Sequence, residues 1–118
     1  MQQIDDIVTL TSARGGWQGV ISDIVSLGNP ELYRVENLTY GDVINGSCIV
    51  AGSDIASSNT DYPEWEVGQS VNLYNLRGTI QAIDGRMITV QIIDIRSEDI
   101  TFTRTHIVPR WRLLIENN

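Results

Sequence analysis

The side chains with the most reactive chemistry in this sequence are a single histidine, His106, and a single cysteine, Cys48. A catalytic triad would require one of them beside a carboxylate and a suitable nucleophile or base. Cys48 lies in the apolar run 47–50, which is typical of a buried small hydrophobe, because a reactive thiol needs exposed, electropositive surroundings. One histidine is also too few for a histidine-based metal cluster. The sequence therefore predicts no catalytic residue, no metal ligand and no cofactor site, and favours a protein that is not an enzyme.

Carboxylates form two groups that could bind Ca²⁺ or transfer protons. The groups are Asp61, Glu64 and Glu66, and Asp94, Glu98 and Asp99. Neither group follows the spacing of an EF-hand loop, so both are interpreted as solvated loops. The segment 14–16, Arg-Gly-Gly, could cradle a phosphate with its backbone N–H groups, but the glycine spacings of nucleotide-binding loops are absent. That segment is therefore interpreted as a turn.

Large aromatic side chains near the expected loops are more promising as contacts for a partner. The set is Trp17, Tyr33, Tyr40, Tyr62, Trp65, Tyr74 and Trp111. In the polar middle of the chain, Tyr62 and Trp65 flank Pro63, an arrangement that could line a peptide groove or enclose a cation. The predicted partner contacts are Trp17, Tyr62, Trp65 and Trp111. The alternative is that these rings fill the junction between two halves of the molecule.

The charge pattern works against polyanionic partners. The chain has a formal net charge of −7, and all eight of its basic residues are arginines. A net-negative surface repels nucleic acid and anionic membranes, so we expect no membrane partner and no general affinity for nucleic acid. A local patch could override this repulsion, and its candidate residues are Arg14, Arg77, Arg110 and Arg112. Trp111 between two of these arginines could stack a base, or it could lie in a core while the arginines pair with carboxylates.

Length and hydropathy limit the architecture. At 118 residues the chain suits one ordinary domain or two very small ones. Its first residues lack a basic segment followed by an apolar one, and no apolar run approaches the roughly 20 residues that span a bilayer. The single cysteine cannot form an intramolecular disulfide. These features predict a soluble, cytoplasmic protein.

Residue types and periodicity predict an all-β fold. Isoleucine, valine and threonine dominate the apolar positions, and branching at Cβ suits a pleated strand. Residues 87–92 alternate clearly, with three aliphatic side chains on one face and two polar ones on the other. No segment combines helical spacing with a cap and a stop signal, and the best helix candidate, 59–65, is interrupted by a proline. The predicted tight hairpin turns are Asp84-Gly85 and Asn45-Gly46.

The two halves of the chain present the same order of patterns. Each begins with a V-x-L strand, at 8–10 and 71–73, and continues through a loop to a G-x-I strand, at 19–21 and 78–80. Two more strands follow in each half, at 32–35 and 47–50 in the first and at 87–90 and 100–103 in the second, and then a short closing turn. The predicted closing turns are 52–55 and 109–113. Taken as two copies, these motifs resemble the small SH3-like barrel, in particular its Tudor and KOW members.

The resemblance implies two small SH3-like barrels in tandem. We expect them to pack on each other, because about 55–60 residues make only a marginal core alone. The predicted organisation is a first barrel at 1–57, a linker at 58–65 and a second barrel at 66–118. A single β-sandwich or barrel without separable halves is the alternative.

The absence of a catalytic constellation favours a non-enzymatic interaction module. Its expected partner is a protein, a peptide or a second copy of the chain, because loops on a small barrel are where binding specificity usually lies. One alternative is nucleic-acid binding through the arginine patch, which the resemblance implies for many relatives. Another is an enzyme whose site is shared between the subunits of an oligomer.

Overall fold

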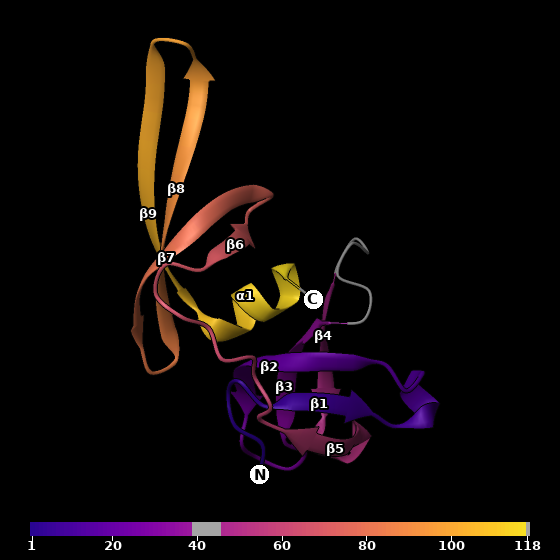
Figure 1. Ribbon diagram of the computed structural model, residues 1–118. Helices are drawn as coiled ribbons and strands as arrows, with labels where there is room; N and C mark the ends of the chain where they lie inside the picture. The colour runs from indigo at the N-terminus through magenta and orange to yellow at the C-terminus, as the bar shows by residue number, and fades with distance from the viewer. Residues whose placement is uncertain (39–45, 118) are drawn as a thin grey trace. The chain divides into compact units, whose positions relative to one another are not determined.

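The structure, a computed structural model, describes residues 1–38 and 46–117, without the side chains of residues 96 and 97 (Figure 1). Contacts divide the chain into two compact units, Met1–Tyr62 and Pro63–Asn118. Each unit contains one antiparallel sheet, so the predicted all-β class is confirmed. Tyr40 and Asn45 lie outside the described residues, and with them the predicted Asn45-Gly46 turn.

The first unit holds a five-stranded sheet. Its strands are β1 (Ile7–Leu10), β2 (Gln18–Ser26), β3 (Leu32–Asn37), β4 (Ser47–Ala51) and β5 (Ile55–Asn59). Their order in the sheet is β4-β3-β2-β1-β5, so the last strand returns to pair with the first. Two 3₁₀ helices connect the strands, Ser12–Arg14 between β1 and β2 and Gly52–Asp54 between β4 and β5. The second of these occupies the predicted closing turn at 52–55.

The core of the first unit comes from alternate residues of four strands. Its buried members are Val8, Leu10, Ile21, Tyr33, Val35 and Val50. The V-x-L strand contributes two of them, because residues two apart point to the same side of a strand. Partly buried side chains pack against this cluster, namely Trp17, Ile24, Cys48 and Ile55. Trp17 and Cys48 therefore belong to the edge of a hydrophobic core.

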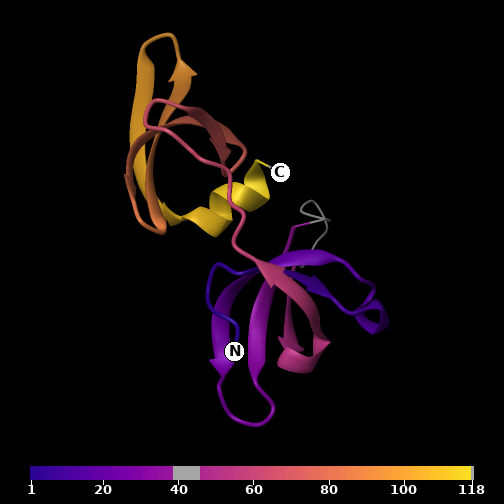
Figure 2. The ribbon, with the colours of Figure 1, turned by 60° about the horizontal axis from the view of Figure 1, so that its bottom comes forward.

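The second unit holds a four-stranded sheet and a short α-helix. Its elements are β6 (Ser70–Leu73), β7 (Leu76–Asp84), β8 (Met87–Ser97), β9 (Ile100–Pro109) and α1 (Arg110–Glu116). The strand order is β6-β7-β8-β9. Strand β7 pairs with β8 only as far as Ile92, whereas β8 and β9 pair along their whole length. The β8–β9 hairpin therefore continues beyond the rest of its sheet, as the orange ribbon shows in Figures 1 and 2.

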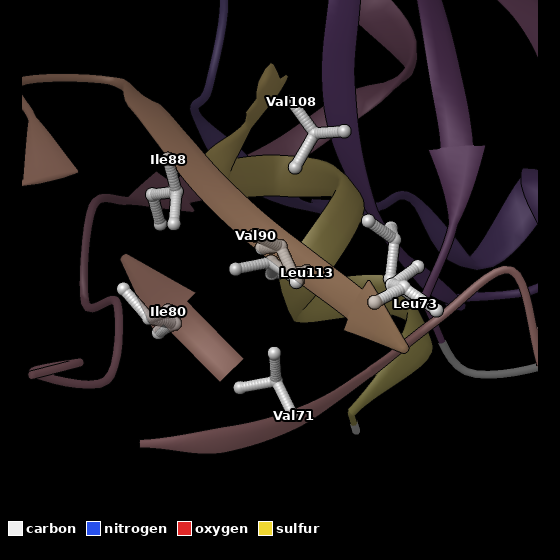
Figure 3. Close-up of a cluster of buried hydrophobic side chains, with 8 residues drawn as sticks. Val71, Leu73, Ile80, Ile88, Val90, Val108 and Leu113 are labelled. Carbon is white, nitrogen blue, oxygen red and sulfur yellow. The ribbon is translucent and has the colours of Figure 1, made fainter. Parts of the chain in front are cut away.

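The core of the second unit joins all four strands to the helix (Figure 3). Its buried side chains are Val71, Leu73, Ile80, Ile88, Val90, Ile92, Val108 and Leu113. The alternation predicted at 87–92 is confirmed, because Ile88, Val90 and Ile92 are all buried. Leu113 is the contribution of α1 and is fully buried. Burial of this leucine packs the helix against the sheet.

The opening hairpins of the two units have the same register. Val8 lies opposite Gly19 in the first unit, and Val71 lies opposite Gly78 in the second. Both glycines are required by close packing, because a Cβ at Gly19 would meet Val35 and a Cβ at Gly78 would lie 2.6 Å from Val90 Cγ1. A register shift follows each G-x-I strand at its isoleucine, between Ile21 and Asp23 and between Ile80 and Ala82.

The structure corrects the prediction for the end of the second unit. The pattern predicts a closing turn at 109–113, but the α-helix α1 begins at Arg110. A helix of seven residues has little stability of its own, and Pro109 at its N-cap offers no side-chain hydrogen bond. Contact with the sheet through Leu113 stabilises it instead, which is a tertiary effect that local spacing does not reveal.

The segment 59–65, which its proline disfavours as a helix, is indeed not helical, since Asn59 ends β5 and the following residues are irregular. Two other expectations differ from the structure. Strand β5 also extends two residues into the range 58–65 that was expected to be a linker, and the boundary between the units falls after Tyr62. At the β7–β8 turn, Asp84 pairs with Met87, so the two turn residues are Gly85 and Arg86.

Candidate interaction sites

A pocket of about 300 Å³ lies in the second unit, beside β6 and α1. Its lining residues are Pro63, Trp65, Gln69, Ser70, Val71, Leu114 and Asn117. Trp65 was predicted as a partner contact, and its half-buried indole packs against the core of this unit. Ligand pockets in proteins begin at about this volume. The pocket is therefore large enough for one or two side chains of a bound segment.

The segment that carries Trp65 is held by a turn just before β6. The amide of Glu66 donates to Gln69 Oε1 at 3.0 Å, and the amide of Gln69 donates back to the Glu66 carbonyl at 3.1 Å. Gly68 has a φ of 92°, a conformation that glycine adopts without strain. Its amide donates to the Ile80 carbonyl at 2.8 Å. The turn thus fixes one wall of the pocket to β7.

The opposite wall of the pocket is fixed by the end of the helix. The Asn117 side chain accepts from the Asn72 amide at 2.8 Å and donates to the Asn72 carbonyl at 3.0 Å. Its amide group also donates to the Leu113 carbonyl at 2.8 Å. Glu116 Oε1 accepts from the amide of Tyr74 at 2.7 Å, in the β6–β7 turn. Asn117 therefore pairs with β6 as a neighbouring strand would, and α1 covers this edge of the sheet.

The chemistry of the pocket follows from its lining. None of the seven lining residues is charged, and the apolar surfaces of Trp65, Val71 and Leu114 face the same space as amide and hydroxyl groups. Such a lining suits an uncharged group that combines an apolar body with a hydrogen-bonding backbone. Glu64 and Glu66 flank Trp65 in the chain and are exposed. A bound segment with basic residues beside its apolar anchor would complement them.

The other predicted aromatic contacts are divided between the two units. Trp17 packs on the first core, and Tyr62 donates its hydroxyl proton to the Asp5 carbonyl at 2.8 Å. Trp111 lies on α1, where the guanidinium carbon of Arg112 is 4.6 Å from its ring centroid. Trp17 and Tyr62 therefore have structural contacts within the first unit, and only Trp65 lines the pocket.

The arginines proposed as an anion patch are also divided. Arg14 lies in the first unit, 3.6 Å from Asp54 and 3.2 Å from the Ile49 carbonyl, to which it donates. Arg77 lies on β7 and donates to Asn72 Oδ1 at 3.2 Å. Arg110 and Arg112 lie on α1. Arg14 thus has an acidic partner and a carbonyl partner within its own unit.

The reactive side chains have ordinary surroundings. Burial raises the pKa of the Cys48 thiol, and the Arg14 charge lowers it by less. A raised pKa keeps the thiol protonated and unreactive at neutral pH. His106 contacts the ring of Tyr74 edge-on, with centroids 5.3 Å apart. Within the described part of the chain, no three His, Cys, Asp or Glu side chains come together as a metal site would require.

Tyr33 is the one buried phenol of the first core. Its hydroxyl donates to Glu31 Oε2 at 2.7 Å and accepts from the Gln2 amide at 3.2 Å. Burial raises the pKa of Tyr33 above its ordinary value of 10.0, and the hydrogen bond to the Glu31 carboxylate raises it further. These contacts tie the start of the chain to β3, so we assign Tyr33 a structural role.

Sequence reasoning missed a second surface, the far half of the β8–β9 hairpin. Four large apolar side chains there are about half exposed or more: Ile93, Ile95, Ile100 and Phe102. Ile93 and Ile95 flank Asp94 on β8, and Ile100 and Phe102 alternate with threonine on β9, as the residues of an ordinary amphipathic strand would. The missed signal was strand length, because 100–103 was expected to be a whole strand and is only the first part of β9.

Comparisons with known proteins found no match for this chain. No family model matches it, and no significant match was found among curated proteins or among solved structures. Among the described residues, no helix is long and apolar enough to cross a membrane. The two candidate interaction surfaces are the Trp65 pocket and the β8–β9 hairpin.

Proposed function

We propose that the chain is a non-enzymatic interaction module that binds a segment of a protein or peptide partner in the Trp65 pocket. The observation that carries the proposal is the uncharged pocket of about 300 Å³ between the Trp65 turn and α1. The partner segment presents one apolar anchor residue to the indole and Leu114. Its backbone exchanges hydrogen bonds with the side-chain amide of Gln69 and the hydroxyl of Ser70, because the donors of the Asn117 side chain are already used within the unit.

The acidic residues beside the pocket further restrict the class of peptide that it would bind. Glu64 and Glu66 stand on either side of Trp65, and the chain as a whole is acidic. Basic residues flanking the anchor would gain from these carboxylates, mainly in the rate and specificity of binding. The preferred partner is therefore a short segment with a proline or aliphatic anchor between lysines or arginines.

We also propose that the two units are copies of one SH3-like barrel. The shared registers of Val8 with Gly19 and Val71 with Gly78 support this idea. The strand order β4-β3-β2-β1-β5, with a 3₁₀ helix before β5, supports it for the first unit. In the second unit α1 takes the position in the chain at which the first unit has its 3₁₀ helix and β5.

The pocket is tested by selecting short random peptides on the immobilised full chain and measuring their affinities by calorimetry. Ser70 is exposed and lines the pocket, so Ser70→Arg should fill it with a charged side chain without disturbing the core. We expect the selected peptides to lose about tenfold in affinity or more with this variant. Ser57→Arg, at an exposed serine of β5, is the matched control and should bind as the wild type does.

Two results would contradict the proposal. If the selected peptides bind Ser70→Arg and Trp65→Ala as tightly as the wild type, the pocket is not the site. If no peptide is selected and the chain instead shifts a DNA or RNA oligonucleotide at low salt, the nucleic-acid alternative replaces the proposal. Neutralising Glu64 and Glu66 to glutamine should weaken peptides with basic flanks and leave uncharged peptides unaffected.

A further inference from the structure

Strand β9 is a long strand at the end of its sheet. It runs for ten residues, Ile100–Pro109, and pairs on one side with β8. The outer side of an edge strand presents backbone N–H and C=O groups that can pair with another strand. Native proteins usually protect such an edge with lysine, an internal proline, a bulge or a covering element. In β9 the one charged residue is Arg104, and the one proline is its last residue.

Two other strand edges in the molecule have backbone groups bound by a side chain of the same unit. Asn117 satisfies both backbone groups of Asn72 on β6, the opposite edge of the same sheet. In the first unit, Arg14 donates to the Ile49 carbonyl on β4, which is only five residues long. By contrast, the register of β9 against β8 shifts only at its tip, between Ile95 and Ser97.

The exposed side chains of the hairpin favour association. Ile95 is 71% exposed and Ile107 is 67% exposed, although both are large and apolar. Ile107 lies opposite Thr89, and Ile95 lies opposite Thr101, so this face of the hairpin is free of charge along its length. Phe102, 50% exposed, lies on the other face opposite Asp94. A long strand with apolar residues and little charge is a typical site of strand-to-strand pairing.

The two ends of the β8–β9 hairpin carry opposite charges, which favours a second copy of the hairpin as the partner. Its tip carries Glu98 and Asp99. Its base carries Arg86 and Arg110, which are held together by a hydrogen bond from the Arg110 amide to the Arg86 carbonyl at 2.7 Å. Asp84 also lies at the base, and Arg112 follows Arg110 on α1. Three arginines against one aspartate make the base positive. A second hairpin of the same kind, running antiparallel, would place each acidic tip beside a basic base.

We propose that β9 pairs antiparallel with β9 of a second copy of this chain, which joins the two four-stranded sheets into one continuous sheet. The pairing is two-fold symmetric, so the same edge serves both copies. This inference goes beyond the peptide pocket and does not depend on it, because the pocket lies beside β6 at the other edge of the sheet.

The arginine in the strand selects the register. A two-fold centre at Arg104 would place two guanidinium groups opposite each other, which is unfavourable. A centre at Thr103 places Arg104 of each copy opposite Phe102 of the other. There the guanidinium lies over an aromatic ring, on the face that also carries Asp94. In this register the tip residues Glu98 and Asp99 lie opposite Val108 and Ile107 of the other copy, about two and three residues from its Arg110, a span of about 7–10 Å.

Sedimentation of the full chain over a range of concentrations tests the proposal. We expect a reversible monomer–dimer equilibrium with a mass approaching twice 13.2 kDa at high concentration. Phe102→Lys places a lysine beside the partner's Arg104 and should weaken the dimer by about tenfold or more. Ile95→Lys, on β8 and on the opposite face, is the matched control and should change the dissociation constant far less. Circular dichroism checks that both variants keep the fold.

A charge exchange tests the antiparallel orientation. The tip variant carries Glu98→Arg and Asp99→Arg, and the base variant carries Arg86→Glu and Arg110→Glu. Each variant alone brings like charges together at both ends of the dimer and should dissociate. An equimolar mixture restores opposite charges at both ends, so it should form a heterodimer with affinity near that of the wild type. Generic association through apolar surface does not predict this rescue.

Several results would overturn the proposal. A chain that stays monomeric at every concentration excludes the pairing outright. If Ile95→Lys dissociates the dimer and Phe102→Lys does not, the copies pack through the uncharged face and not through the β9 edge. If the tip and base variants fail to rescue each other while both remain folded, the orientation is wrong. If Ser70→Arg abolishes the dimer, the second copy occupies the Trp65 pocket instead.

Discussion

The two units begin alike and end differently. Strands β1 and β6 share a register with the strand that follows, since Val8 lies opposite Gly19 and Val71 lies opposite Gly78. In the first unit β5 pairs along the outer side of β1. In the second unit α1 lies beside β6, and Asn117 forms the hydrogen bonds that a strand would have formed. One opening pattern is therefore compatible with two kinds of ending.

The edge strands on the other side of each sheet, β4 in the first unit and β9 in the second, differ as well. Strand β4 has five residues, whereas β9 has ten and belongs to a hairpin that continues beyond β7. In the first unit the edge is short and Arg14 binds one of its carbonyls. The second unit instead has a covered β6 edge and a long β9 edge. The two surfaces proposed for binding, the Trp65 pocket and the β9 edge, both lie where the second unit differs from the first.

The largest expected effect is loss of the helix from the second core. Leu113→Ala removes a fully buried side chain and leaves a cavity between α1 and the sheet. We expect the second unit to lose about 2–5 kcal/mol of unfolding free energy. Urea unfolding followed by the NMR signals of Val90 and Val35 reports the two units separately. Ile107→Ala, at an exposed position of β9, is the control, and a loss no greater than that of the control would contradict the role of Leu113.

The next effect concerns Tyr33, the buried phenol of the first core, which has no counterpart in the core of the second unit. Tyr33→Phe removes a hydrogen bond to the Glu31 carboxylate and should cost the first unit about 1.5–3 kcal/mol near neutral pH. The second unit has Ile88, which pairs with Val108 as Tyr33 pairs with Val50, and should be unaffected. Urea unfolding at neutral pH, followed by the same two NMR signals, measures both units. A loss that is shared equally between the units would contradict the assignment.

Alkaline pH should act on the same unit. Because the pKa of Tyr33 is raised in the folded state, its stabilising contribution is full below pH 10.0 and is lost as the pH rises above that value. The raised pKa of Cys48 acts in the same direction. The first unit should therefore lose stability at alkaline pH, and Tyr33→Phe should make that loss smaller. An unfolding free energy whose pH dependence is identical in the wild type and in Tyr33→Phe would contradict this origin.

A smaller effect tests the covering of the β6 edge. Asn117→Ala removes the hydrogen bonds to both backbone groups of Asn72, and water can replace them in part because Asn117 is exposed. We expect a loss of about 0.5–1.5 kcal/mol and faster hydrogen exchange at the Asn72 amide. Thr105→Ala, an exposed change on β9, serves as the comparison and should leave that amide unchanged. Unaltered exchange at Asn72 in the Asn117 variant would show that α1 does not protect this edge.

Much of the fold could be predicted from the sequence, because its strands follow simple alternation. The V-x-L and G-x-I patterns located β1, β2, β6 and β7, and the alternation at 87–92 located the buried face of β8. The sequence singles out Trp65 as a partner contact because a large aromatic side chain is unusual in a polar segment, and Trp65 lines the pocket, although its role as a contact stays a prediction. The pocket itself could not be predicted, since its other wall belongs to α1, and the packing of Leu113 that fixes α1 is a tertiary effect.

The length of β9 was also beyond local reasoning. Alternation of apolar and polar residues covers only 100–103, and nothing in the sequence alone shows that β9 runs to Pro109 or that β7 stops pairing at Ile92 and leaves the hairpin to extend. The absence of lysine is clearer with the fold in view. Lysine is a common protection of an exposed strand edge, and β9 carries Arg104 instead. A planar guanidinium stacks on an aromatic ring more readily than an ammonium does, which suits the register proposed with Phe102.

The pairing of β9 with a second copy can be tested by hydrogen exchange at low and at high protein concentration, because this experiment compares the two edges of one sheet in one sample. If β9 pairs with a second copy, amides of residues 100–106 should become more protected as concentration rises. Amides of β6 should show no such change, since α1 covers that edge in the monomer. Protection of β9 that does not depend on concentration, or an equal change at both edges, would contradict the account.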